Sequence, residues 1–476
     1  MNKTAAIIIS IVLFLGVIFQ ALVIVDYHSD DFRLGFFRQR TEPVVYFESF
    51  DESIAEQYFK PFSIYVNDGE QSWVMRNDED FFDTLWQDGK NLITDGLLDE
   101  LEESDESWAS VSRNPGVLFK FGYPLPINYL GFILSMEFDD TVPPDIEKIL
   151  VVPSEEAMDV YVKGRNRVYE ARGLEATGLF LQPNFEGFAD LLGVEPSYSS
   201  DSYREIHNFI SEDVLDEYIE PDILVVLDTN PRTLPWLELS VPGLIKEYND
   251  ALKIRNEAER ETAVEEVGNK IRNDVLGRTV NTFEMHIDLS EKLYFSNQFN
   301  IYEISRTGWI RYRYTEGTEG DEKGNIGDAF INAVETLSAL TELSENSHNL
   351  YLSGITEDDE TYTFTFDYRY GQSVIAFTEN DHAAVITGTA TRTIEALVCP
   401  LNIDENIGEE KVSAGYILNF PYITQMNDVN IINIEAYEMY VGYMKTEAML
   451  EVVSPVWLIE KRTGEKQVLY LIGAEE

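Results

Sequence analysis

Hydrophobic and polar positions divide the chain into one long apolar run and a much longer remainder in which they alternate. Residues 4–25 form a run of 22 residues without a charge, bounded by Lys3 and Asp26. A helix rises about 1.5 Å per residue, so this run can cross a bilayer core of about 30 Å. The pattern predicts a transmembrane anchor at 4–25, preceded by a cytoplasmic tail at 1–3.

Two other interpretations of this run fit less well. A cleaved signal peptide has an apolar region of about 7 to 15 residues and a small-x-small exit, which residues 22–26 do not provide. A buried core helix is at odds with an uncharged run at the extreme N-terminus.

Arg33, Arg38 and Arg40 beyond the exit favour the opposite orientation by charge count, but long domains translocate largely regardless of charge. We expect a single-pass protein of the cell membrane with an extracytoplasmic body.

After the anchor, short alternating segments predict strands. Residues 59–66 alternate around a proline and are followed by an Asn-Asp-Gly turn, so they predict a hairpin with 73–75 as the returning strand. Residues 79–101 have mostly helical spacing, interrupted at Gly89 and Gly96, which predicts a broken helix.

Further along, a helix followed by an antiparallel meander is predicted twice. Residues 244–276 predict one charged amphipathic helix that stops at Gly277, and residues 326–343 predict a second helix. The expected strands are 117–121, 129–138, 149–152, 161–162, 168–169, 280–289, 299–304, 308–314, 361–366, 373–377, 383–389, 393–398, 429–443, 448–453, 456–460 and 468–472.

These patterns predict an α+β fold, in which antiparallel sheets with packed helices follow one transmembrane helix. The number of residues after the anchor is too large for one core. We expect an N-terminal α+β domain at 26–220, a middle helix-plus-meander domain at 221–320 and a related C-terminal domain at 321–476.

Acidic residues dominate the charge: 86 Asp and Glu against 35 Lys and Arg give a net charge of −51. Such a field repels nucleic acid, anionic lipid headgroups and anionic wall polymers, so none of these is expected as a ligand. The acidity fits a solvated surface adapted to salty or alkaline surroundings, and it also fits a docking surface for a cationic partner.

Known catalytic motifs are absent from the sequence. It has no His-Glu-x-x-His, Gly-x-Ser-x-Gly or P-loop, and its five histidines, at 28, 207, 286, 348 and 382, lack metal-ligand spacing. Residues 402–408 resemble a calcium loop but have Ile407 at the sixth position, so a polar turn is the better interpretation. Cys399 is the single cysteine and ends an apolar strand, which predicts a buried, inert thiol. We expect no enzyme activity, no cofactor and no metal.

One feature of the anchor could bind a partner helix. Gly16 and Gln20 are four residues apart and therefore share a helix face. A small residue permits close helix approach, and a glutamine can hydrogen-bond across it. Alternatively, Gln20 reaches water at the interface.

Four short stretches, taken in order, resemble the YycH family. They are Phe59-Lys60-Pro61-Phe62-x-Ile64-x-Val66, Tyr314-Thr315-Glu316-Gly317, the run from Phe366 to Val374 (Phe-Asp-Tyr-Arg-Tyr-Gly-Gln-Ser-Val), and Gly442-Tyr443 followed by Pro455-Val456-Trp457. The family tends to have Asp where this chain has Glu316. The resemblance implies a three-domain extracytoplasmic body without catalytic activity. It also implies two partners, a sensor histidine kinase (YycG/WalK-like) and a YycI-like protein, in cell-wall control of Gram-positive bacteria.

Two other functions stay open at this point. An anchored cell-envelope enzyme or solute-binding module would use a pair of carboxylates in a cleft of the first domain. A purely structural envelope protein would need no site.

Overall fold

The computed structural model describes the chain in separate ranges. These are residues 58, 60–67, 71–76, 82–98, 101–112, 114–127, 129–130, 145–154, 157–164, 167–176, 180, 198–199, 235–276, 283–288, 291–315, 323–344, 350–370, 373–405, 436–461 and 466–470. The chain forms two units, Met1–Tyr46 and Phe47–Glu476, and every described element belongs to the second. In the described part of the chain, no helix combines the length and the hydropathy that crossing a membrane requires. The predicted anchor at 4–25 lies outside it.

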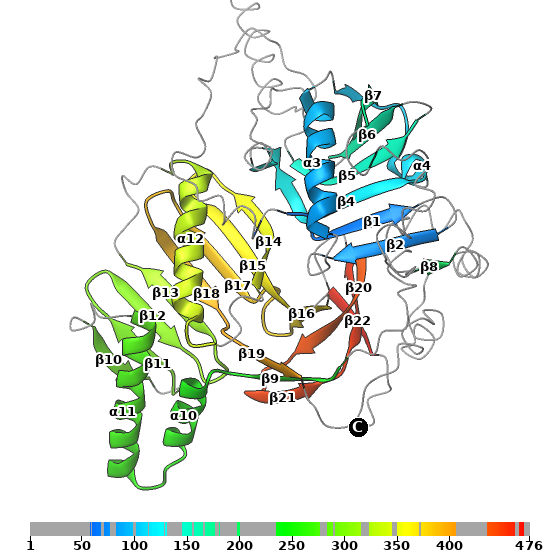
Figure 1. Ribbon diagram of the computed structural model, residues 1–476. Coiled ribbons are helices and arrows are strands. Elements are labelled where there is room, and N and C mark those ends of the chain that lie inside the picture. Colours follow the sequence, from blue (N-terminus) through cyan, green and yellow to red (C-terminus); the bar gives the residue numbers. More distant parts are fainter. Residues whose placement is uncertain are drawn as a thin grey trace, which may run out of the picture. The chain divides into compact units, whose positions relative to one another are not determined.

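The first sheet has eight strands in the order β3-β7-β6-β5-β4-β1-β2-β8 (Figure 1). All its neighbours pair antiparallel. Its strands are β1 (Ser63–Asn67), β2 (Gln71–Arg76), β3 (Glu102–Glu103), β4 (Gly116–Pro126), β5 (Asp145–Pro153), β6 (Met158–Lys163), β7 (Val168–Leu174) and β8 (Tyr198–Ser199). The predicted hairpin is confirmed, with Val66 opposite Trp73.

One uninterrupted helix, α3 (Phe82–Leu98), packs against this sheet, so the predicted break at its glycines is wrong. A Cβ at Gly89 would lie 2.2 Å from Cζ of Phe119, and one at Gly96 would lie 2.9 Å from Leu174. Both glycines therefore let the helix backbone approach the sheet closely. The short helix α4 (Trp108–Val111) begins at Ser107, whose side chain accepts a hydrogen bond from the Ser110 N–H.

The second sheet has twelve strands in the order β10-β11-β12-β13-β18-β17-β15-β16-β20-β22-β23, with β14 paired to β15. They are β10 (Glu284–Ile287), β11 (Leu293–Ser296), β12 (Asn300–Ile304), β13 (Ile310–Tyr314), β14 (Leu350–Glu357), β15 (Tyr362–Tyr370), β16 (Ser373–Phe377), β17 (Ala384–Gly388), β18 (Thr393–Val398), β20 (Ala436–Lys445), β22 (Val456–Lys461) and β23 (Lys466–Tyr470). Only β16 and β20 pair parallel among the described strands. The α+β class is confirmed.

A small third sheet joins three distant segments: β9 (Leu237–Ser240) lies between β19 (Asn402–Glu405) and β21 (Leu450–Val453). The polar turn predicted at 402–408 is wrong for 402–405, which pair with β9, and 406–408 lie outside the described residues. The prediction also lacked β9, β11 and β14. Residues 129 and 130, expected to begin a strand, are helical, and 131–138 lie outside the described residues.

The single helix expected at 244–276 is two helices, α10 (Gly243–Leu252) and α11 (Glu257–Leu276). The break has a local cause. Asn256 accepts hydrogen bonds through its side chain from the N–H groups of Ala258 and Glu259, which caps the start of α11. The helix predicted at 326–343 is confirmed as α12 (Ile326–Thr341), and the Asn325 side chain caps it by accepting a hydrogen bond from the Asp328 N–H.

Most of the second sheet consists of two copies of one unit. Helix α11 precedes the meander β10-β11-β12-β13, and α12 precedes β14-β15-β17-β18, with β16 as an insertion. Residues 300–304 correspond to 384–388, and 310–314 correspond to 394–398, with the same difference in residue number for both pairs. The last two strands of each copy therefore correspond. The copies meet where β13 pairs antiparallel with β18. The domain boundaries at 220 and 320 stay a prediction.

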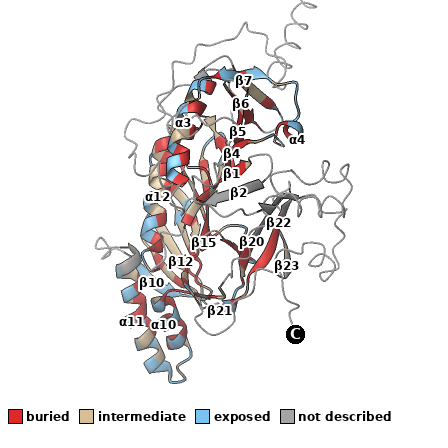
Figure 2. Cartoon of the chain, turned by 45° about the vertical axis from the view of Figure 1, so that its right-hand side comes forward, coloured by how far each residue is buried: buried red, intermediate tan, exposed pale blue. Residues whose placement is uncertain are grey.

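Buried residues lie on the sheets and along one side of the helices (Figure 2), and most of them are apolar. Phe330 of α12 packs against Phe364 and Phe366 of β15, with ring centroids 5.2 and 6.3 Å apart. Cys399 is buried, as predicted, and burial raises the pKa of its thiol to about 12. The thiol is therefore neutral at physiological pH.

Candidate functional site

Phe62, just before β1, packs against two strands of the second sheet. Its ring centroid lies 5.4 Å from that of Tyr351 in β14. The guanidinium carbon of Arg369 in β15 lies 5.7 Å from the Phe62 ring centroid and 5.3 Å from the Tyr351 ring centroid. A guanidinium in this position is attracted to the aromatic faces by about 0.5 to 2 kcal/mol. These three half-buried side chains fasten the first sheet to the second.

A second group of rings surrounds Phe330. Tyr58 packs edge-on against Phe330 and Phe366, with centroids 5.6 and 5.9 Å away. The buried Tyr129 meets Phe330 edge-on at 6.3 Å, and its hydroxyl donates to the Ile326 carbonyl across 3.5 Å. Desolvation raises the pKa of Tyr58 and of Tyr129, so both hydroxyls stay neutral. We call the whole set the aromatic junction: Tyr58, Phe62, Tyr129, Phe330, Tyr351, Phe366 and Arg369.

The stretches that carry the sequence resemblance meet at this junction and continue from it. Residues 59–66 supply Phe62, and 366–374 supply Phe366 and Arg369. Strand β16 then places Val374 opposite Gly442 of β20, and Gly442 lies opposite Val456 of β22. A Cβ at Gly442 would lie 2.4 Å from the Val374 carbonyl oxygen, so the close pairing requires glycine. Three of the four stretches thus form one continuous part of the structure.

The fourth stretch, 314–317, lies elsewhere. Tyr314 ends β13, and the guanidinium carbon of Arg392 lies 4.7 Å from its ring centroid. Residues 316 and 317 are outside the described part.

Polar contacts hold the start of α12 beside the junction. Lys323 Nζ lies 2.6 Å from a carboxylate oxygen of Glu357 and 4.5 Å from the ring centroid of Tyr362. The Tyr362 hydroxyl donates to the Gly324 carbonyl across 3.0 Å. The segment before α12 is therefore tied to β14 and β15.

At β10–β13 and β18, the second sheet has one face against helices and one face whose residues are partly or fully exposed. Met285 and Leu293 contact α11, since a Cβ at Gly268 would meet both side chains. Their neighbours His286 and Tyr294 alternate to the other face, which we call the open face. Its row of cross-strand partners runs His286, Tyr294, Glu303, Arg311 and Leu397, and none of them is buried.

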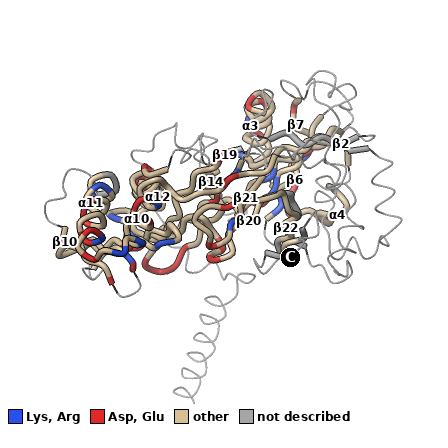
Figure 3. Tube along the Cα trace, turned by 90° about the horizontal axis from the view of Figure 1, so that it is seen from below, with Lys and Arg blue, Asp and Glu red and all other residues tan. Residues whose placement is uncertain are grey.

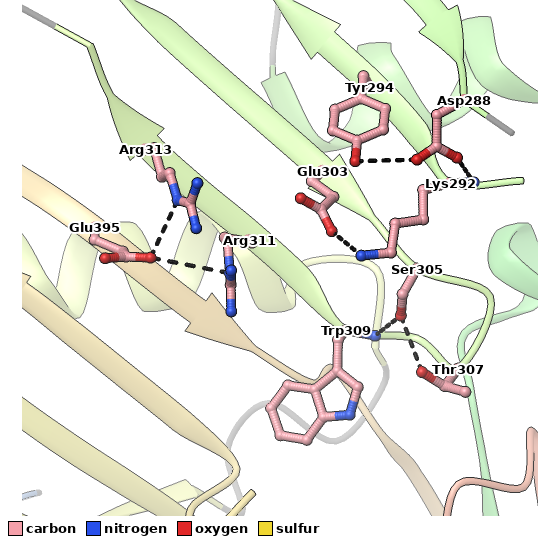
Figure 4. A network of polar contacts seen from close by, with 10 residues as sticks. All are labelled: Asp288, Lys292, Tyr294, Glu303, Ser305, Thr307, Trp309, Arg311, Arg313 and Glu395. Atoms are coloured by element: carbon pink, nitrogen blue, oxygen red, sulfur yellow. Dashed lines mark hydrogen bonds and ion pairs between the residues drawn. The ribbon is translucent and has the colours of Figure 1, made fainter. Parts of the chain in front are cut away.

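Ion pairs cover the open face across β11, β12, β13 and β18 (Figure 4). Lys292 is bonded to Glu303. Glu395 accepts from Arg313 across 3.3 Å, and Arg311 Nε lies 3.9 Å from the same oxygen. Exposed pairs of this kind contribute about 0 to 1 kcal/mol each to stability. The open face is thus a charged surface whose side chains are at least partly exposed to solvent.

His382, just before β17, contacts the side chains of Asp367 and Ser353. Its Nδ1 lies 2.9 Å from Oδ2 of the buried Asp367 and 3.3 Å from Oγ of Ser353. In a catalytic triad the hydroxyl and the carboxylate bind opposite nitrogens of the imidazole. Here both approach the same nitrogen, so this geometry does not activate Ser353. Asp367 also accepts from the Ala383 N–H, which joins β15 to the start of β17.

The residues singled out in the sequence have different outcomes. Gly16, Gln20, His28, His207 and His348 lie outside the described residues. His286 stacks on Tyr294, with ring centroids 4.9 Å apart. In the described part of the chain, no three His, Cys, Asp or Glu side chains group closely enough to hold a metal ion.

Comparisons with known proteins give distant structural likenesses. No family model matches the sequence, and no curated protein matches it. The structure is similar to that of YycH from Bacillus subtilis, with a TM-score of 0.46 and 7% identity over 89% of this chain and 98% of that one. It is also similar to the C-terminal domain of YpeB from Bacillus megaterium, with a TM-score of 0.25 and 13% identity over 43% of this chain and 97% of that one. Both likenesses are too distant to carry a functional argument.

The contact between Phe62 and Arg369 is not predicted by the sequence pattern, although both residues lie in stretches that carry the resemblance. The alternation of aromatic and charged residues at 366–370 places Arg369 on the strand face opposite Phe366, together with Asp367. Tyr351 gave no signal, because the strand that carries it was not predicted.

Proposed function

We propose that this chain is a membrane-anchored, non-catalytic regulator that acts by binding other proteins. The observation that carries the proposal is the aromatic junction. Two separate stretches that resemble the YycH family supply Phe62, Phe366 and Arg369 to it, and a third stretch pairs with its continuation through β16 and β20. Tyr58 and Phe62 precede β1 and take part in this junction. A partner bound to the second sheet would thereby influence the first sheet.

The proposed partners are a sensor histidine kinase of the YycG/WalK type and a YycI-like protein. Their support is the sequence resemblance together with a charged open face that is suited to protein contact. A bound regulator changes kinase output only if it binds the two kinase conformations with different affinity. Regulation would therefore require the anchor and the body to engage the kinase together in the cell membrane, with the body outside.

The test is reconstitution of the full-length chain with the YycG/WalK-type kinase of the same organism in lipid nanodiscs. We expect capture of the kinase in gentle detergent and a several-fold change in its autophosphorylation rate. Arg369→Met should reduce this change, whereas Arg167→Met, at a half-exposed arginine that pairs with Glu103 in the first sheet, should not. A full-length protein that never captures the kinase or a YycI-like protein would contradict the proposal.

A further inference from the structure

The two copies of the helix-plus-meander unit place corresponding strands at two edges. In the second copy, β14 pairs with β15 and packs beside β4 of the first sheet, where Tyr351 meets Phe62. In the first copy the corresponding strand is β10, the outermost strand of the twelve-stranded sheet (Figure 1). The first sheet packs beside β14. Because β10 holds the corresponding place in the first copy, the same kind of neighbour fits beside β10.

Strand β10 has the features of a docking edge. Among the described strands it pairs with β11 alone, which leaves the other row of its backbone groups without a strand partner there. Ile287 is 40% exposed, and His286 is exposed and stacked on Tyr294 with an interplanar angle of 6°. An apolar side chain and a flat aromatic pair therefore lie beside a strand edge that no other described strand occupies.

The charges of the residues near β10 indicate which kind of strand can bind at this edge. Acidic and basic residues are interspersed around α10, α11 and β10 (Figure 3), but the basic neighbours Lys292 and Arg306 are bonded to Glu303 and Glu291. Glu284 on β10 is exposed. With a net charge of −51, two copies of this chain repel each other, so pairing of β10 with β10 of another molecule is disfavoured. A strand with basic side chains is complementary.

We propose that the β10 edge binds an extended segment of a partner protein in which apolar and basic residues alternate. The partner strand would add to the sheet by backbone hydrogen bonds to β10, with its apolar side chains on Ile287 and its basic side chains toward Glu284. This inference rests on the proposed function, because the partner is the one that the regulator binds there.

The test uses a fluorescent ten-residue peptide of alternating lysine with valine or phenylalanine, added to the full-length protein in nanodiscs. Fluorescence anisotropy should show saturable binding. A peptide with glutamate in place of lysine should bind at least about tenfold more weakly. A lysine peptide with N-methyl groups on alternate amides should also lose binding, because it cannot form the row of backbone hydrogen bonds.

Two matched substitutions locate the site. Ile287→Lys should weaken binding about tenfold, whereas Leu450→Lys, at an apolar residue that is 53% exposed on β21 of the third sheet, should leave it unchanged. The variant Ile287→Thr keeps a β-branched side chain and should bind with an intermediate affinity. A fluorophore on Ile287→Cys should respond to the peptide while one on Leu450→Cys should not, and the buried Cys399 adds no second label.

Equal binding of the lysine and glutamate peptides, undiminished binding of the N-methyl peptide, or equal losses in Ile287→Lys and Leu450→Lys would overturn the inference. The proposed function can fail separately. If the kinase is captured and Ile287→Lys does not alter the capture, only the role of β10 is lost. If the peptide binds β10 and the kinase is never captured, the kinase assignment is lost.

Discussion

Gly89 in α3 lies directly against the ring of Phe119 in β4: a Cβ at Gly89 would be 2.2 Å from Cζ of that ring. Gly89→Ala should therefore destabilise the protein by about 1 to 3 kcal/mol through overpacking, although alanine is the better helix former by about 1 kcal/mol. Urea unfolding measures the change. Gly243→Ala is the control, because no atom lies within 4 Å of its Cβ position, and its effect should stay within about 0.5 kcal/mol. Equal stability of the two variants would show that α3 does not pack so closely.

Arg369 should stabilise the aromatic junction mainly through the faces of Phe62 and Tyr351. Arg369→Met keeps an apolar stem but removes the charge, and we expect a loss of about 1 to 2 kcal/mol in the free energy of unfolding. Arg313→Met, at a side chain that is 52% exposed and paired with Glu395, should cost no more than about 0.5 kcal/mol. Thermal unfolding by circular dichroism compares the two, and a larger loss in Arg313→Met would argue against the junction.

Asn256 should determine where α11 begins. Asn256→Ala removes the side-chain acceptor for the N–H groups of Ala258 and Glu259, at a cost of about 1 kcal/mol. Thr262→Ala on an exposed turn of the same helix is the control and should not destabilise. Hydrogen exchange should be faster in the first turn of α11 in the Asn256 variant. Unchanged exchange there would show that the cap is unimportant.

Cys399 should weaken the protein at alkaline pH. Its folded-state pKa of about 12 lies above the value of 9.0 for a free thiol, so the folded protein holds this proton more tightly than the unfolded chain does. Its contribution is complete below about pH 9 and is lost as pH rises toward about 12. Urea midpoints of wild type and Cys399→Ala, measured at pH 8 and 10.5, isolate the contribution of the thiol to the free energy of unfolding.

We expect wild type to lose more stability than Cys399→Ala between these two pH values. Tyr302 and Tyr248, whose pKa values are also raised to about 12 by burial, titrate in both proteins and cancel in the comparison. Parallel losses in the two proteins would contradict the buried state of the thiol.

Local features could be predicted from the sequence, and contacts between distant segments could not. The β1–β2 hairpin followed from alternation around a turn, and α12 followed from its apolar spacing. Gly89 and Gly96 read as helix breakers in the sequence, because their contact with the first sheet involves residues far along the chain. The segment between α10 and α11 has neither glycine nor proline, so the cap by Asn256 was overlooked.

The junction and the third sheet were beyond prediction for the same reason. Phe62 and Arg369 are separated by most of the chain, and β9 finds its partners in β19 and β21 far downstream. Backbone pairing at such separation depends on tertiary packing rather than on local preference. The open face was implicit in the alternation of each strand, but the row that joins His286 to Leu397 depends on register.

The seam between β13 and β18 has a practical consequence for dissecting the protein. Ile310 and Val398 are partners across it, so the two repeats share one hydrogen-bonded ladder. A fragment that stops near residue 320 would lack β18. The backbone groups of β13 that pair with β18, around Tyr312, would then be exposed to strands of other molecules. Such truncated proteins should aggregate. Removing strands from the ends of the twelve-stranded sheet would leave the pairing of β13 with β18 intact.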